Sequence, residues 1–293
     1  MRLRDGRWRA RVLDARGSSV HREHHRISTS PPPLRTQIRE LLRARDLFVL
    51  IFGREVRVRY KQTALGLIWV VLQPLVPALI FAAVFGAFAR LPSEGSPYLL
   101  FALAGLVVYG LFSNAVARSG TSFLRDGNLV TKVYFPRAVL PLAAGTAAIV
   151  DFLVGSLVLL VLMVALGQGF AVAIVTAPAI AIAVLSLGLA VGLAVSALTA
   201  HYRDFAIAVP FVLQVLLYGS PVLYSSELVP ASLQGIYALN PMVGLIESFR
   251  SALLGTAPPS SADLAMAAAS GVVLVGVCLV VYARASRDLS DVI

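Results

Sequence analysis

The feature that most constrains this chain is a series of apolar runs, each close to the length that crosses a lipid bilayer. A helix needs about 20 apolar residues to span the hydrocarbon core. Hydrophobic residues make up 58% of the 293 residues and charged residues only 14%, unlike a typical soluble domain. The sequence therefore predicts an all-α membrane protein with six transmembrane helices. The expected spans are 69–88, 98–117, 138–166, 170–198, 205–224 and 264–282.

The positions of the cations predict the orientation of these spans. All but two of the 25 lysines and arginines precede the first span, follow the second or fourth span, or lie in the C-terminal tail. The two exceptions are Arg90 and Arg250. Because cytoplasmic loops carry an excess of Lys and Arg, we expect both termini in the cytoplasm and a multi-pass chain surrounded by membrane lipid.

The chain is expected to comprise three regions. Residues 1–33 are basic and poor in large apolar residues, which is typical of a disordered extension. Residues 34–62 place apolar residues at roughly helical spacing among arginines, which predicts an amphipathic helix at the cytoplasmic membrane surface. Residues 63–293 form the six-span domain. Three histidines near the N-terminus have no ordered scaffold around them, so no metal site is expected.

A dense group of cations precedes the first span. Arg57, Arg59 and Lys61 lie within five residues, and Gly66 follows shortly after them. Cations before a span commonly extend to lipid headgroups, which would account for one or two of them. The density of the group, with a glycine that permits close approach, also suits the binding of a phosphate.

The segment 40–75 resembles the first part of type-2 ABC exporter permeases that move lipid-linked polysaccharides. That family includes exporters of O-antigen, teichoic acid, capsule and galactan. The matching positions are Arg59, Tyr60, Lys61, Leu65, Gly66, Trp69, Pro74 and Leu75. The resemblance implies that a lipid pyrophosphate reaches the membrane domain beside Arg57, Arg59, Tyr60, Lys61, Leu65 and Gly66. It also implies a location in a bacterial cytoplasmic membrane.

The loop between the second and third spans carries a further match. Its apolar residues are spaced as in a short amphipathic helix, which either caps the bundle or docks in a groove of another protein. Asn128, Leu129, Lys132, Phe135, Pro136 and Arg137 match the coupling helix of the family. The resemblance therefore assigns contact with an ATPase to Phe123, Leu124, Asn128, Leu129, Lys132 and Tyr134.

The segment between the fifth and sixth spans is expected on the external side. Two helical patches flank Asn240 and Pro241, and each is too short to span. A re-entrant helix pair is allowed there if its broken backbone packs in protein. The family has such a pair, with an Asn-Pro and a later Glu and Arg, here Glu247 and Arg250. Those two residues are three apart and could also form an ordinary surface ion pair.

One acidic residue inside the spans needs a partner. Asp151 lies midway along the third span, where an ionised carboxylate is costly. It is therefore expected to face the bundle interior, either lining a path or hydrogen-bonded to a polar group such as Gln73 or Thr146. Pro74 is expected to bend the first span.

Aromatic and small residues suggest further contacts inside the membrane. Phe81 and Phe85 on the first span, and Tyr109 and Phe112 on the second, either line a sugar path or pack between helices and at the membrane interface. Gly188 and Gly192 form a face of small residues that allows another helix to approach closely.

The sequence has no G-x-x-x-x-G-K-[ST] motif for binding a nucleotide. ATP and Mg would therefore be bound by a separate ATPase, and no cofactor or catalytic residue is expected in this chain. We predict a permease subunit in which two copies work with two ATPase subunits to export a polyprenyl-pyrophosphate-linked glycan, with no nucleic acid among its partners.

The alternatives are an exporter of drugs or small lipids, or a polytopic enzyme acting on polyprenyl phosphates. The enzyme would need converging carboxylates, and the cytoplasmic acids are scattered.

Overall fold

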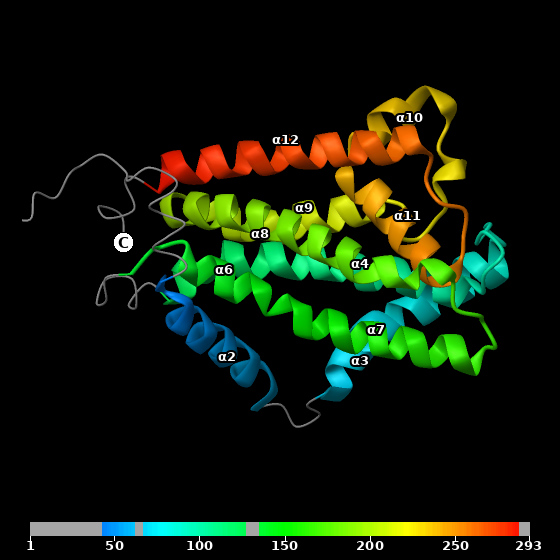
Figure 1. The fold of residues 1–293 in the computed structure, drawn as a ribbon, viewed down its shortest axis with the longest axis horizontal. Helices are drawn as coiled ribbons and strands as arrows, with labels where there is room; N and C mark the ends of the chain where they lie inside the picture. Colours follow the sequence, from blue (N-terminus) through cyan, green and yellow to red (C-terminus); the bar gives the residue numbers. More distant parts are fainter. Residues whose placement is uncertain (1–42, 62–66, 127–134, 287–293) are drawn as a thin grey trace, which may run out of the picture. The chain divides into compact units, whose positions relative to one another are not determined.

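The computed structural model describes residues 43–61, 67–126 and 135–286. The chain divides between residues 33 and 34 into two units, and all described residues belong to the second unit. Every regular element in these ranges is a helix (Figure 1). The all-α fold class is therefore confirmed for the described part of the chain.

The helices follow one another with short connections. The first region contains α2 (Arg45–Lys61), α3 (Leu67–Phe81), η1 (Ala82–Phe88) and α4 (Tyr98–Gly120). Next come α6 (Val139–Thr146), α7 (Ala148–Ala165), η2 (Val172–Thr176), α8 (Ala177–His201) and α9 (Asp204–Tyr218). The last part contains η3 (Ser226–Leu228), α10 (Ala231–Ala238), α11 (Pro241–Leu254) and α12 (Ser261–Ala285).

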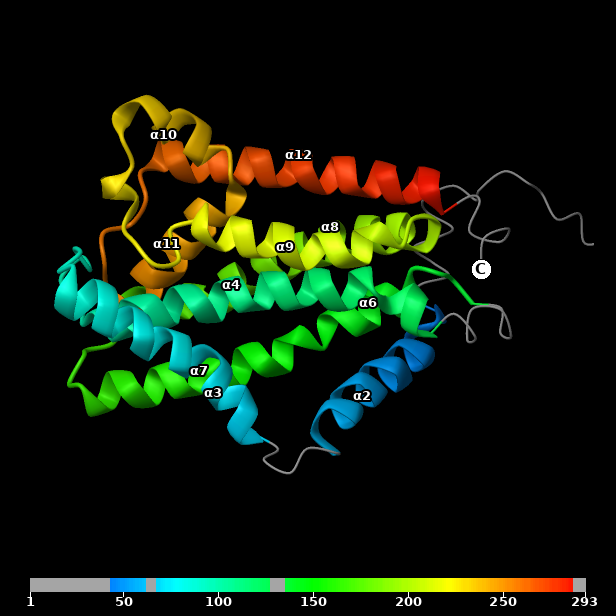
Figure 2. The same ribbon diagram turned by 180° about the vertical axis from the view of Figure 1, so that it is seen from behind.

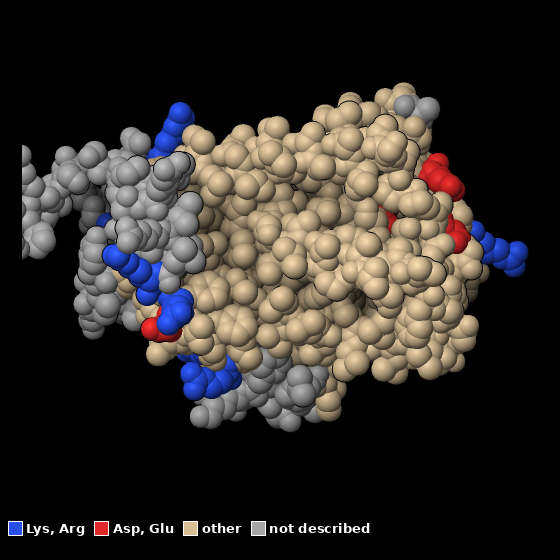
Figure 3. Space-filling view, viewed as in Figure 1, with Lys and Arg blue, Asp and Glu red and all other residues tan. Residues whose placement is uncertain are grey.

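Five segments in the described ranges are long and apolar enough to cross a membrane. They are Ile68–Phe88, Tyr98–Gly120, Val139–Ala165, Val172–His201 and Ser261–Ala285. These correspond to five of the six predicted spans. The remaining prediction, 205–224, contains α9, which has 15 residues where about 20 are needed. Figure 3 shows the charged side chains of one face gathered toward the two ends of the bundle, with an uncharged band between them.

Helix α4 is the centre of the bundle. It packs against α3, α6, α7, α8, α9 and α11, and most of its side chains are buried. Both views of the ribbon place α12 and α8 on one side of α4 and α7 on the other (Figures 1 and 2). A Cβ at Gly192 would lie 2.5 Å from the Cβ of Ser119, and one at Gly188 would lie 2.9 Å from that of Ala115. The predicted close approach of small residues is thus confirmed, and it joins α8 to α4.

Helix α2 lies beside α6, at the end of the bundle away from α10 and α11 (Figure 1). Its Ile51 is buried against Phe123 of the segment after α4, Leu140 of α6 and Tyr282 of α12. A helix is therefore present over Arg45–Lys61 within the segment 34–62, and its amphipathic role stays a prediction. Its position at a membrane surface stays a prediction.

Candidate functional site

A cavity of about 430 Å³ lies between α3, α4, α7 and α9. Its lining includes several polar side chains, each able to donate or accept hydrogen bonds, which is unusual inside a bundle of apolar helices. These are Gln73, Tyr109, Ser113, Asn114, Asp151 and Gln214. Most of the remaining lining is apolar and includes Val70, Leu106, Phe152 and Leu217. We refer to this space as the polar cavity.

Prolines and glycines shape the polar cavity. Pro74 in α3 and Pro210 in α9 both line it, and each leaves the carbonyl four residues earlier without its helical donor. Gly110 on α4 also lines the cavity, and a Cβ placed there would meet no atom within 4 Å. The cavity therefore exists partly because a side chain is missing at Gly110.

Asp151 forms an ion pair with Arg118. The Nη2 of Arg118 donates to the Oδ2 of Asp151 at 2.5 Å, and the two side chains are only 13% and 10% exposed. The second span was expected to end at residue 117, but α4 continues to Gly120 and holds Arg118 in its last turn. Thr146, one of the partners expected for Asp151, instead donates its Oγ1 to the carbonyl of Leu142. The carboxylate is thus balanced by a cation at the edge of the polar cavity.

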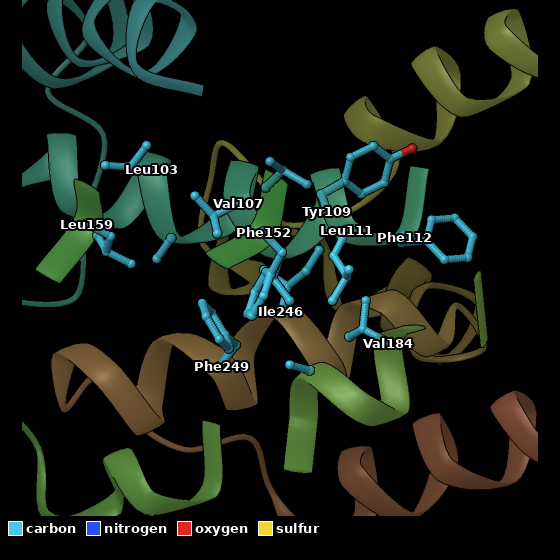
Figure 4. Close-up of a cluster of buried hydrophobic side chains, with 14 of the residues drawn as sticks. Leu103, Val107, Tyr109, Leu111, Phe112, Phe152, Leu159, Val184, Ile246 and Phe249 are labelled. Atoms are coloured by element: carbon cyan, nitrogen blue, oxygen red, sulfur yellow. The ribbon is translucent and has the colours of Figure 1, made fainter. Parts of the chain in front are cut away.

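Two of the five predicted path residues, Tyr109 and Asp151, line the polar cavity. Tyr109 donates its hydroxyl to the carbonyl of Leu213 and so links α4 to α9. Figure 4 shows this hydroxyl directed away from the side of the core that holds Phe249. Phe112 is buried in the core with its ring 6.1 Å from that of Tyr109, and it does not line the cavity.

The other two predicted path residues form a pair on the first span. The rings of Phe81 and Phe85 stack with their centroids 5.8 Å apart, and neither residue lines the polar cavity. Their predicted place on a sugar path stays a prediction.

The predicted lipid access site is described only in part. The exposed Arg57 donates its Nε to the carbonyl of Gly53 at 3.1 Å. The backbone of Arg59, Tyr60 and Lys61 continues α2, but their side chains lie outside the described part of the chain. Leu65 and Gly66 also lie outside it.

The predicted ATPase-contacting segment is likewise described only at its start. Phe123 is buried beside Ile51, and Leu124 is exposed. Asn128, Leu129, Lys132 and Tyr134 lie outside the described residues.

Next to that segment, four charged residues join α2 to the end of the helical segment after α4. Arg54 donates to Asp126 at 2.7 Å, and Arg125 donates to Glu55 at 2.9 Å. Burial acts to lower the pKa of Arg54, but its hydrogen bonds with Asp126 and Glu55 outweigh this effect and leave the pKa raised. Sequence reasoning missed this network, although Glu55 and Asp126 are among the few acids expected on the cytoplasmic side.

Asn240 and Pro241 begin helix α11. The Oδ1 of Asn240 accepts from the backbone N–H of Met242 at 3.0 Å, and its Nδ2 donates to the Oγ of Ser220 at 2.9 Å. Pro241 occupies the first helical turn, where its missing N–H costs nothing. The Asn-Pro pair is thus a helix cap that also ties α11 to the segment after α9.

Arg250 on α11 is buried rather than part of a surface ion pair. It is 2% exposed, and it donates to the carbonyls of Phe101 at 3.1 Å and Val222 at 2.6 Å. Its guanidinium also lies 3.6 Å from the centre of the Phe101 ring. No ion pair between Glu247 and Arg250 occurs among the described residues, so that expectation is wrong. The guanidinium instead occupies the space beside Gly105, where a Cβ would lie 2.6 Å from its Nη2.

Comparison with known proteins gives consistent matches. The family model described as ABC-2 type transporter matches residues 46–254. An O-antigen export system permease protein of Myxococcus xanthus is 28% identical over 256 residues, covering 87% of this chain and 98% of that protein. Another O-antigen export system permease protein, from Klebsiella pneumoniae, is 27% identical over 206 residues, which cover 70% of this chain and 79% of that protein. A polysialic acid transport protein of Escherichia coli is 23% identical over 209 residues, covering 70% and 80%.

Proposed function

Because the chain belongs to the ABC-2 type transporter family, we propose that it is the permease subunit of a complex that exports a polysaccharide across a bacterial cytoplasmic membrane. Its relatives include proteins named for O-antigen export and for polysialic acid transport. The single observation in this molecule that carries the proposal is the polar cavity inside a bundle of apolar helices.

The lining of the polar cavity suits a sugar chain. Gln73, Asn114 and Gln214 offer amide donors and acceptors, which can pair with hydroxyl groups that would otherwise lose hydrogen bonds on leaving water. The ring of Tyr109 offers an aromatic face for stacking. A path for drugs or small apolar lipids would not need this density of hydrogen-bonding groups.

We propose that a second copy of the chain completes the path. A volume of about 430 Å³ is in the range that holds a small ligand, whereas a polymer needs a continuous channel. Helix α9 borders the cavity and exposes large apolar residues, among them Ile207 and Phe211. In this arrangement α9 and residues 219–224 together form the fifth of six spans, and both termini lie in the cytoplasm.

The substrate in this proposal is a glycan linked to a polyprenyl pyrophosphate. Arg57, Arg59 and Lys61 supply the cations that a diphosphate needs at the membrane surface. Pro74 lies inside α3 and lines the polar cavity, and the bend expected at a proline would favour a route from that surface into the bundle. A separate cytoplasmic ATPase binds ATP and Mg and acts on the segment that begins at Phe123. The pair α10 and α11 serves as the external re-entrant element.

Matched serine substitutions test the path. Ser113 lines the polar cavity, and Ser186 is exposed on α8 away from it. In a strain depleted of this chain, Ser113→Phe is expected to fail to restore surface polysaccharide and to leave a lipid-linked glycan in the cytoplasmic leaflet. Ser186→Phe should restore export. Normal export by Ser113→Phe at equal protein level, or accumulation of a lipid without sugar, would reject the proposal.

A further inference from the structure

A second cavity, of about 420 Å³, lies between α7 and α8 and reaches η2 and α11. Among its lining side chains, Ser156 is the one polar member, and no lining residue is charged. The others are Leu111, Ile149, Phe152, Leu153, Leu160, Ile174, Ala177, Pro178, Ala181, Ile182, Leu185, Phe249 and Leu253. We refer to this space as the apolar cavity.

The apolar cavity opens sideways from the bundle. Helices α7 and α8 both pack on α4, and the cavity separates them along part of their length. Leu153 on α7 is 58% exposed and Ile182 on α8 is 64% exposed, whereas Leu111 and Phe249 at the floor are fully buried. Because both walls belong to segments long enough to cross the membrane, the opening faces the hydrocarbon of the bilayer.

The two cavities share a wall. Phe152 and Leu111 line both the apolar cavity and the polar cavity. The ring of Phe152 lies 5.8 Å from that of Phe249, tilted by 58°, and Figure 4 shows Phe152 close to Ile246 and Phe249. The position of Phe152 thus depends on what fills the space on its apolar side.

The chemistry of the apolar cavity selects its occupant. A sugar chain would lose its hydrogen bonds there, because Ser156 is the one polar residue available. A neighbouring helix is about 10 Å across, too wide for a space of this volume. A hydrocarbon chain matches the lining, and apolar cavities of this kind take up apolar molecules rather than water. The Oγ of Ser156 is buried and has no hydrogen-bond partner within the described part of the chain, so the lining holds no polar group arranged to bind a polar ligand.

We propose that one acyl chain of a bilayer phospholipid enters between α7 and α8, fills the apolar cavity and supports Phe152 from behind. With the acyl chain behind it, Phe152 stays in place as the wall of the polar cavity when the occupant of that cavity changes. This inference requires the chain to lie in a membrane but does not require the substrate proposed above, so the two can fail separately.

Photo-crosslinking of the full chain in phospholipid nanodiscs tests the site. The probe is a phosphatidylethanolamine with a diazirine near the end of one acyl chain. In the wild type we expect labelling concentrated on peptides that contain 149–160 and 177–185. Ala181→Phe places a ring in the cavity, and labelling of these peptides should fall at least about tenfold because no space remains for the chain. Ala183→Phe is the matched control, since Ala183 is exposed on the same helix and does not line the cavity.

A second measurement keeps the test decisive if Ala181→Phe folds poorly. Ser156→Leu fills the cavity from the opposite wall and should also reduce labelling. Added phospholipid should raise the thermal stability of the delipidated wild type and of Ala183→Phe, but not of Ser156→Leu, because a lipid stabilises only the protein that binds it. Equal labelling of all variants would overturn the proposal. Displacement of the probe by a polyprenyl phosphate, but not by unlabelled phospholipid, would also overturn it and assign the cavity to the carrier lipid.

Discussion

Arg118 and Asp151, 33 residues apart in sequence, form a largely buried ion pair that joins the last turn of α4 to the first turn of α7. The pair borders the polar cavity, because Asp151 is part of its lining. An isolated charge at this position would be costly, so each residue makes the other tolerable. The relationship explains how an apolar bundle keeps a carboxylate beside its proposed path.

Replacing one member of this ion pair should destabilise the protein more than replacing both members with apolar residues. Arg118→Met removes the cation that pairs with the Asp151 carboxylate and is expected to cost about 3–5 kcal/mol of folding free energy, whereas Arg118→Met combined with Asp151→Leu should recover most of that loss. The measurement is thermal unfolding of the purified protein in detergent. Arg45→Met is the control, because the Arg45–Asp46 pair is fully exposed and should contribute almost nothing. Similar stability of the single and double variants would contradict the interpretation.

The four-charge network should hold α2 against the end of the bundle. Arg54→Glu places like charges beside Glu55 and Asp126, so α2 should exchange its amide hydrogens faster, by up to about fivefold for a loss of about 1 kcal/mol. The double variant Arg54→Asp with Asp126→Arg should restore the protection of α2 against exchange. High salt should reduce the difference in exchange rate between Arg54→Glu and the wild type, because salt screens charges. Hydrogen exchange of residues 45–58 reads out the effect. Unchanged exchange in Arg54→Glu would show that the apolar contacts of Ile51 are sufficient.

Two glycines on α4 should respond oppositely to the same substitution. At Gly105 an added Cβ would lie 2.6 Å from both the Nη2 of Arg250 and the carbonyl oxygen of Val222. Gly105→Ala is therefore expected to cost about 1–3 kcal/mol, since it displaces a buried guanidinium from its acceptors. At Gly110 a Cβ meets nothing within 4 Å, so Gly110→Ala should be neutral or stabilise the helix by up to about 1 kcal/mol. Thermal unfolding compares them, and equal effects would contradict the placement of Arg250.

The stability contribution of Glu247 should depend on pH in a direction set by its environment. Burial raises the pKa of Glu247, assisted by Glu94 and opposed by Arg250. A raised folded-state pKa means that the ionised form is penalised in the folded protein. That penalty is fully present above the folded pKa and is relieved as the pH falls through it toward the usual value of about 4.3. Glu247→Gln should therefore be more stable than the wild type at neutral pH, and its advantage should shrink on acidification. An advantage that grows at low pH would contradict this.

The apolar runs predicted where most of the long helices lie. The length of α9 and the partners of Arg250 became known only from the contacts between helices. Helices long and apolar enough to cross a membrane occur at five of the expected spans, because a run of about 20 apolar residues in a membrane has few other structures available. The length of α9 was not predictable, since the apolar composition of 205–224 continues past Tyr218 while the helix ends there. The surface ion pair expected for Glu247 and Arg250 was wrong because their spacing was the sole guide, and the guanidinium finds buried carbonyls on other segments.

The sequence by itself determined the membrane class, the positions of most spans and the resemblance to exporter permeases. These properties depend on local composition and on short motifs, which are read without knowing which helices are neighbours. The tertiary structure decided that Gln73, Tyr109, Asp151 and Gln214 share one cavity, that Arg118 pairs with Asp151, and that Phe152 separates a polar from an apolar space. The physical reason is that hydropathy sets how far each helix extends through the bilayer, whereas the partner of a side chain depends on packing between helices distant in sequence.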